Sequence, residues 1–110
     1  MNASGDAPVF GARAFGVFSG DGTKIGGGNF ESVTRVSTGL YEVTLTKALP
    51  DNKYGVVANC AISGGGDARS ANEDADFTDK STTKFRIVCN YGGDNTAYRF
   101  DPARVNFHIF

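Results

Sequence analysis

The sequence is poor in the residues that catalytic and metal sites most often use. Its 110 residues include no tryptophan, a single histidine and two cysteines. Cys60, Cys89 and His108 are too few to form a zinc site. A hydrolase triad would depend on the one histidine, and no Gly-x-Ser-x-Gly motif is present. We therefore expect no enzymatic activity and no cofactor. The two cysteines lie on separate predicted strands, and we expect free thiols rather than one disulfide.

The sequence also lacks an excess of one charge and a long apolar run. Eleven basic residues stand against twelve acidic ones, which gives a net charge of -1, so electrostatics offers no reason to expect nucleic-acid binding. No apolar stretch approaches the roughly 20 residues that cross a bilayer. The opening MNASGDAP has neither the basic start nor the apolar segment of a secretion signal. The expected partners therefore exclude nucleic acid and the membrane interior.

Glycine and aromatic residues are abundant and lie in alternating segments. Fifteen glycines, nine phenylalanines and four tyrosines favour an all-β chain with tight turns. Apolar and polar residues alternate in short segments between turn clusters, and no segment of useful length has helical periodicity. The predicted strands span 13–18, 23–25, 29–37, 40–47, 54–62, 84–91, 96–100 and 104–110. This pattern predicts a single antiparallel β-sandwich or jelly-roll domain over 9–110, after a lead-in linker at 1–8.

The parity of each predicted strand assigns its side chains to the core or to the outer surface. We expect Phe18, Val88, His108 and Phe110 to point outward, and the apolar ones among them to need cover from another subunit. The predicted core consists of Phe15, Val17, Phe30, Val36, Tyr41, Val43, Leu45, Val56, Ala58, Ile62, Phe85, Ile87, Val105, Phe107 and Ile109.

Three segments, in this order, resemble the C-terminal domains of bacteriophage and prophage tail-fibre proteins. They are GARAFGVFSGDGT at 11–23, SVTRVSTGLYEVTLTKALPDNKYGVV at 32–57 and VNFHIF at 105–110. In such domains an aromatic strand and a Gly-x-Gly turn precede a Gly-x-Tyr-x-Val hairpin, a Pro-Asp-x-x-Tyr-x-Val segment and a final strand. The resemblance implies a homotrimer in the virion, joined to the rest of the tail fibre and docking on bacterial lipopolysaccharide or capsule glycan.

The polar segment 63–83 is the first candidate for a binding site. It is longer than the connections of a compact sandwich usually are, and long loops are commonly functional or disordered. Its candidate ligand-binding residues are Asp67, Arg69 and Phe77, with carboxylates and the guanidinium hydrogen-bonding sugar hydroxyls. Its acidic residues raise the alternative of a calcium site, although the EF-hand spacing is absent. The other interpretation is a solvated surface loop without a ligand.

The segment CNYGGDNTAYRF at 89–100 is the second candidate. Its candidate ligand-binding residues, gathered around a turn, are Tyr91, Asp94, Asn95, Tyr98 and Arg99. A tyrosine offers an apolar face for a pyranose ring and a polar tip for its hydroxyls. The alternative interpretation is that the two tyrosines cover the edge of the core while the polar residues form the turn.

His108 is the metal candidate that we weigh, and only through assembly. In a trimer its outward imidazole would meet two copies on the threefold axis, and the three would hold an ion together. The fibre pattern has two histidines flanking one residue, whereas position 106 is Asn. We therefore assign no metal and expect a histidine with an ordinary hydrogen bond.

The predicted function is recognition of a bacterial surface glycan, without chemistry, by the loops of a trimer. Three copies would multiply weak contacts through avidity. Two alternatives belong to other classes: a trimerising fibre cap that binds nothing, and a glycan depolymerase, which needs two carboxylates across a cleft.

Overall fold

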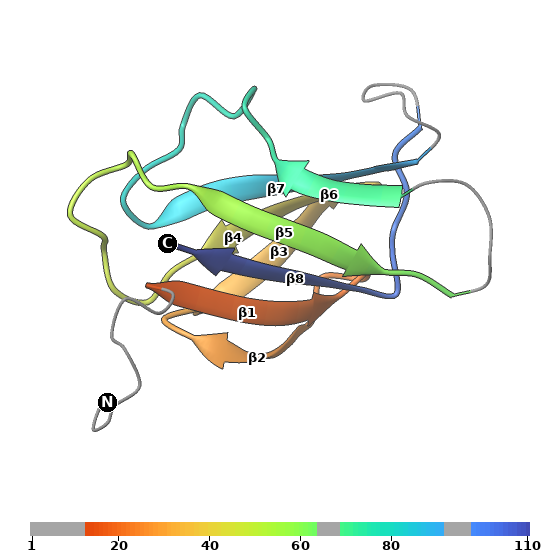
Figure 1. Ribbon diagram of the computed structural model, residues 1–110, viewed down its shortest axis with the longest axis horizontal. Coiled ribbons are helices and arrows are strands. Elements are labelled where there is room, and N and C mark those ends of the chain that lie inside the picture. The colour runs from red at the N-terminus through yellow and green to blue at the C-terminus, as the bar shows by residue number, and fades with distance from the viewer. Residues whose placement is uncertain (1–12, 64–68, 92–97) are drawn as a thin grey trace.

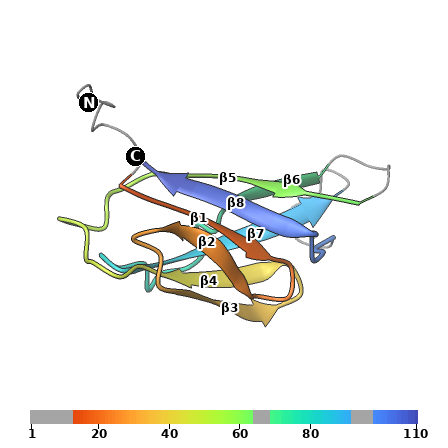
Figure 2. The same ribbon diagram turned by 90° about the horizontal axis from the view of Figure 1, so that it is seen from below.

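The computed structural model describes residues 13–63, 69–91 and 98–110 and contains two antiparallel four-stranded sheets packed together (Figure 1). The strands of the first sheet, in spatial order, are β2 (Lys24–Gly28), β1 (Ala14–Ser19), β8 (Arg104–Ile109) and β5 (Val56–Ala61). Those of the second sheet are β3 (Ser32–Ser37), β4 (Leu40–Thr44), β7 (Lys84–Tyr91) and β6 (Arg69–Glu73). Figure 2 shows β3 and β4 on the opposite side of the molecule from β5 and β8. The predicted all-β sandwich is confirmed. The described residues contain no helix that could span a membrane.

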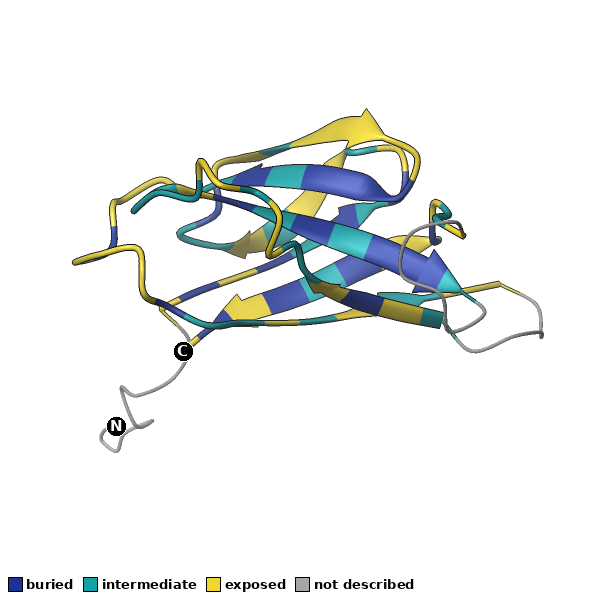
Figure 3. Cartoon of the chain, turned by 90° about the horizontal axis from the view of Figure 1, so that it is seen from above, coloured by how far each residue is buried: buried dark blue, intermediate teal, exposed yellow. Residues whose placement is uncertain are grey.

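The core lies between the sheets and is mainly aromatic. Buried and more exposed residues alternate along the central strands (Figure 3). The centroid of the Phe107 ring lies 5.1 Å from that of Phe30 and 5.4 Å from that of Phe85, both edge-on. Such edge-to-face pairs add to the energy of burying the rings. The members of the predicted core that the structure buries are Phe30, Tyr41, Val43, Leu45, Phe85, Ile87, Val105, Phe107 and Ile109.

The predicted parity of β1 is wrong. Phe18, expected on the outer surface, is buried, and Phe15, expected in the core, is 52% exposed. Gly16 provides the reason, because it faces inward and a Cβ at this position would collide with the rings of Phe30 and Phe107. These two rings fill the space that a side chain would need. The inward face of β1 therefore carries Phe18 and leaves Phe15 outside.

Some other members of the predicted core lie at its margin. Val36 and Ile62 are exposed, Val17 is half-buried, and Val56 and Ala58 are partly buried against the core. Val36 lies within a register shift between β3 and β4, and Ile62 lies just beyond the end of β5. Strict alternation fails at such irregularities and strand ends. Of the side chains predicted to point outward, His108 and Phe110 are exposed and Val88 is half-buried.

The segment 63–83, predicted as one long loop, contains the edge strand β6. β6 pairs with β7, with Ala71 opposite Cys89, and Ala71 is the residue of β6 that is buried. The sequence RSANE has no β-branched or aromatic residue, so pairing along a sheet edge overrides its weak local preference. The strand predicted at 96–100 is also wrong in its described part, where residues 98–100 make one bridge, between Asn90 and Arg99.

A polar clamp, consisting of Arg35, Gly39, Tyr41 and Asp101, joins the two sheets. The Asp101 carboxylate accepts hydrogen bonds from the Gly39 N–H at 2.8 Å and from Arg35 Nε at 3.0 Å. The Tyr41 hydroxyl lies 2.7 Å from the Gly20 carbonyl and 3.1 Å from Asp101 Oδ1, two acceptors for its one proton. Burial raises the pKa of Asp101, but the hydrogen bonds from Arg35, Gly39 and Tyr41 outweigh it, and the pKa is lowered.

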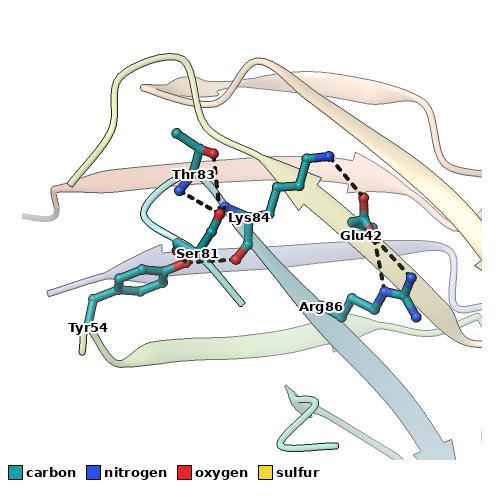
Figure 4. Close-up of polar contacts among 6 residues, drawn as sticks. All are labelled: Glu42, Tyr54, Ser81, Thr83, Lys84 and Arg86. Carbon is teal, nitrogen blue, oxygen red and sulfur yellow. Dashed lines mark hydrogen bonds and ion pairs between the residues drawn. The ribbon is translucent and has the colours of Figure 1, made fainter. Parts of the chain in front are cut away.

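The outer surface of β4 and β7 carries a charged row, consisting of Glu42, Lys84 and Arg86 (Figure 4). Glu42 Oε1 accepts from Arg86 Nε at 3.1 Å and from its Nη2 at 3.0 Å, and Glu42 Oε2 lies 3.8 Å from Lys84 Nζ. Nearby, the Tyr54 hydroxyl lies 2.9 Å from the Ser81 carbonyl and 3.1 Å from that of Lys84. The outer surface of β4 and β7 therefore carries ion pairs of Glu42 with Arg86 and Lys84.

Candidate functional site

Aromatic and cationic side chains gather at the end of β7 in an aromatic cluster, consisting of Arg69, Tyr91, Tyr98 and Phe100. The centroid of the Tyr91 ring lies 5.5 Å from that of Tyr98 and 5.9 Å from that of Phe100. The guanidinium carbon of Arg69 lies 5.0 Å from the Tyr91 centroid and 4.8 Å from the Phe100 centroid. One cation thus stacks on two rings, whose faces carry negative charge density.

Backbone pairing on both sides of β7 assembles the aromatic cluster. Arg69 begins β6 directly opposite Tyr91. On the other side of β7, the Tyr91 N–H donates to the Tyr98 carbonyl at 2.9 Å, and the Phe100 N–H donates to the Cys89 carbonyl at 3.3 Å. Segments that are distant in the sequence therefore meet at one end of the sandwich.

The aromatic cluster is partly open to solvent. Tyr98 is 46% exposed, whereas Arg69, Tyr91 and Phe100 are half-buried. An exposed tyrosine held by a second ring presents a fixed apolar face and a polar tip. The cluster has the features that stacking on a sugar ring requires.

A polar pocket of about 320 Å³ lies beside β6 and β7, lined by Asn72, Val88, Asn90, Arg99 and residues 73–76. Asn90 is 8% exposed, and its Oδ1 and the Nε of Arg99 are buried with no hydrogen-bond partner among residues 13–63, 69–91 and 98–110. Buried polar atoms without partners are rare and unfavourable in folded proteins. The polar pocket is therefore a second candidate site.

Strand alternation places the aromatic cluster and the polar pocket on opposite faces. Asn90 and Arg99 form an antiparallel bridge, flanked by the backbone hydrogen bonds of their neighbours. Tyr91 and Tyr98 are the adjacent residues in the two segments, so their side chains point to the other side of the sheet. The end of β7 and residues 98–100 thus supply side chains to both the aromatic cluster and the polar pocket.

The lining of the polar pocket is mainly acidic. Asp74 Oδ1 accepts from the Asp76 N–H at 3.0 Å within the turn. Glu73 is paired with Lys80 at 2.8 Å. Within the described ranges, no carboxylate pairs with Arg99. The acidic side chains that line the pocket therefore outnumber its one guanidinium, that of Arg99.

The structure unites some of the predicted site residues and separates others. Arg69, Tyr91 and Tyr98 come together in the aromatic cluster, and Arg99 lies in the polar pocket. Phe77 instead stacks on Arg86, with the guanidinium carbon 4.4 Å from its ring centroid. Asp67, Asp94 and Asn95 lie outside the described residues.

Phe100 of the aromatic cluster and Asn90 of the polar pocket are among the site residues that the sequence did not predict. Phe100 adjoins Tyr98 and Arg99 in the sequence, so the aromatic content of 98–100 was a usable signal. Asn90 has an outward parity in its strand, but its pairing with Arg99 depends on a contact between segments. No local pattern could have identified that pairing.

Neither the cysteines nor the acidic residues form a reactive or metal-binding group in the described structure. Both cysteines are free thiols; burial raises the pKa of Cys89 to about 12 and also raises that of Cys60. The part of the chain that the structure describes holds no group of three or more His, Cys, Asp or Glu side chains placed to bind a metal ion. The calcium alternative for 63–83 therefore gains no support from its described residues.

The outer surface of the first sheet carries an apolar row, consisting of Phe15, His108 and Val57, which pair across β1, β8 and β5. Phe15 is 52% and Val57 46% exposed. Phe110 extends this surface, with its ring 6.5 Å from His108, and is 62% exposed. Exposed apolar side chains that adjoin in this way are typical of interaction surfaces.

Comparison with known proteins gives no match: no protein-family model, no curated protein and no solved structure matches this chain.

Proposed function

We propose that the chain is a non-catalytic glycan-binding domain of the tail-fibre type, acting at the surface of a bacterium as part of a virion. The observation that carries the proposal is the aromatic cluster, in which a half-exposed Tyr98 packs against Tyr91, and the guanidinium of Arg69 lies over the Tyr91 ring. The resemblance of 11–23, 32–57 and 105–110 to tail-fibre domains suggests the biological setting.

The aromatic cluster suits binding rather than chemistry. A pyranose ring stacks on the exposed face of Tyr98, and its hydroxyls exchange hydrogen bonds with the phenol and neighbouring polar groups. The buried Cys89 thiol stays protonated at neutral pH because its pKa is about 12. The proposal therefore assigns the cluster a recognition role.

We also propose that three copies assemble through the apolar row. In the row, Phe15 and Val57 flank His108, and none of the three is an Asp, Glu, Lys or Arg. Burial of Phe15 and Val57 against a second copy gains hydrophobic free energy. Joined to the rest of a tail fibre, such a trimer presents three aromatic clusters and binds by avidity.

The test is binding of the intact chain to an array of bacterial lipopolysaccharides and capsular polysaccharides. We expect binding to at least one glycan, weakened about tenfold by Tyr98→Ala, which corresponds to about 1.4 kcal/mol. Phe77→Ala is the matched control, because Phe77 stacks on Arg86 outside the cluster. Equal losses in both variants would contradict a role of the cluster.

The exposed apolar row favours a second candidate, a trimerising fibre cap without a ligand. Absence of binding of the trimer to every glycan and to host cells would support the role of a fibre cap. Release of new reducing ends from a polysaccharide would instead indicate a depolymerase and overturn the non-catalytic proposal.

A further inference from the structure

From the unpartnered polar atoms of the polar pocket, we infer that this pocket binds a pair of adjacent hydroxyls on a neutral sugar residue and excludes acidic sugars. The inference rests on the proposed glycan-binding function and adds a second subsite, with its own selectivity, on the face opposite the aromatic cluster. A cavity of about 320 Å³ is of a size for one monosaccharide unit.

The hydrogen-bonding groups of the pocket match a diol. Asn90 Oδ1 needs a donor and Arg99 Nε–H needs an acceptor, and neither has a partner in the part of the chain that the structure describes. A sugar hydroxyl donates one hydrogen bond and accepts others. Two neighbouring hydroxyls therefore satisfy both atoms at once, one donating to Asn90 and the other accepting from Arg99.

The spacing of the two side chains supports the same ligand. Asn90 and Arg99 form a bridge at a position without direct backbone hydrogen bonds, where antiparallel strands bring their side chains closest. Neighbouring hydroxyls on a pyranose ring are likewise close together. Because Oδ1 and Nε are themselves closed to solvent, binding includes a rotation of both side chains into the cavity.

The charge of the lining sets the selectivity. Asp74 and Asp76 lie on the turn beside the pocket, and Glu73 is already paired with Lys80. A carboxylate on the ligand would lose hydration and meet like charges at the rim, whereas a neutral hydroxyl would find acceptors there. The pocket therefore accepts neutral hexoses and rejects uronic acids.

The experiment titrates the isotope-labelled full chain with methyl glucoside, galactoside and mannoside, and with galacturonate as the acidic match of galactose. We expect at least one neutral glycoside to shift the Asn90 side-chain amide and Arg99 Nε–H resonances, with at least tenfold weaker binding of galacturonate. Absence of these shifts with all three neutral sugars, or equal binding of galacturonate, would overturn the inference.

Variants assign the shifts to the pocket. Asn90→Leu is expected to abolish the shift of the Arg99 Nε–H resonance, and Arg99→Met that of the Asn90 amide resonance. Asp76→Asn is expected to reduce the discrimination against galacturonate. Asn59→Ala is the control, because Asn59 lies on the first sheet and accepts from Asn106 at 2.7 Å. Shifts that persist in folded Asn90→Leu and Arg99→Met would contradict the assignment.

The two proposals fail separately. Polysaccharide binding that falls with Tyr98→Ala, in a chain whose polar pocket gives no response to any sugar, would overturn the pocket and keep the proposed function. A pocket that responds to a neutral glycoside, in a chain whose polysaccharide binding is unaffected by Tyr98→Ala, would overturn the role of the aromatic cluster instead.

Discussion

The outer surfaces of the two sheets present different chemistry to their surroundings. On the first sheet, Phe15, Val57 and His108 adjoin in the apolar row without a carboxylate, ammonium or guanidinium among them. On the second sheet, Glu42 contacts Arg86 in the charged row. Covering an apolar side chain is favourable, whereas covering an ion costs its hydration. The difference shows why a subunit interface is expected on the first surface and open solvent on the second.

The largest effect is expected from reversing the character of the apolar row. Phe15→Glu combined with Val57→Glu should convert a trimer into a monomer, because each copy would bury two charges. Analytical ultracentrifugation at micromolar concentration measures this as a threefold fall in mass. Lys84→Ser, in the charged row, should leave the mass unchanged. A wild-type monomer would contradict the proposed assembly.

The second-largest effect is expected on stability, from breaking the polar clamp that joins the two sheets. Asp101→Ala removes the acceptor of the buried Gly39 N–H and of Arg35, and we expect a loss of about 1–3 kcal/mol in the free energy of unfolding. Urea titration measures it. Asp51→Ala is the control, since Asp51 accepts from Lys53 N–H in an exposed turn. Equal losses in the two variants would mean that the clamp adds nothing.

The same carboxylate predicts a pH dependence. The folded pKa of Asp101 is lowered, so its contribution is present above the pKa of the unfolded chain, about 3.9, and is lost as the pH falls through the folded value. The wild type should therefore lose more stability on acidification than Asp101→Asn. Parallel pH profiles of the two proteins would contradict this assignment.

A smaller effect of opposite sign is expected in the polar pocket. Asn90→Leu removes a buried oxygen that has no partner among the described residues, and the free energy of unfolding should stay unchanged or rise by up to about 1 kcal/mol. Thermal and urea unfolding measure it. A loss above about 2 kcal/mol would show that Asn90 serves the fold instead of a ligand.

The smallest effect is expected in the charged row. Lys84 Nζ lies 3.8 Å from Glu42, and the Lys84 side chain is 49% exposed, so Lys84→Ala should change stability by less than about 0.5 kcal/mol. Urea unfolding checks it, and Arg86→Ala, which removes the closer partner of Glu42, should cost more. The reverse order would contradict this reading of the charged row.

The sequence predicts strands well where one face is consistently apolar. In β8, Val105, Phe107 and Ile109 are buried as their alternation predicts. In β1 the same reasoning selects Phe15, because it cannot anticipate that Gly16 makes room for rings from other strands. The strand β6 has no apolar pattern at all, and only its partner β7 defines it.

The candidate sites likewise combine residues that the local sequence identifies with residues that only tertiary contacts bring together. Tyr91 and Tyr98 could be identified from composition around a turn, because an aromatic pair is a local signal. The placement of Arg69 beside them depends on the pairing of β6 with β7. The juxtaposition of Asn90 and Arg99 likewise arises from a single bridge between segments. Side-chain types were predictable, whereas their partners were set by tertiary structure.

The backbone contact between Arg13 and Ile109 has a mechanical consequence. The Arg13 N–H donates to the Ile109 carbonyl at 2.7 Å, so the start of β1 and the end of β8 lie together. The end of β7 and the start of β6, which carry Tyr91 and Arg69 of the aromatic cluster, lie at the opposite end of the sandwich (Figure 1). A force applied at residue 13, while a bound glycan holds the aromatic cluster in place, acts along β1 and β8 in opposite directions. It shears all the hydrogen bonds between these two strands at once. Forces that pull residues 13 and 110 apart would instead break the hydrogen bonds between β1 and β8 one after another, at a much lower force.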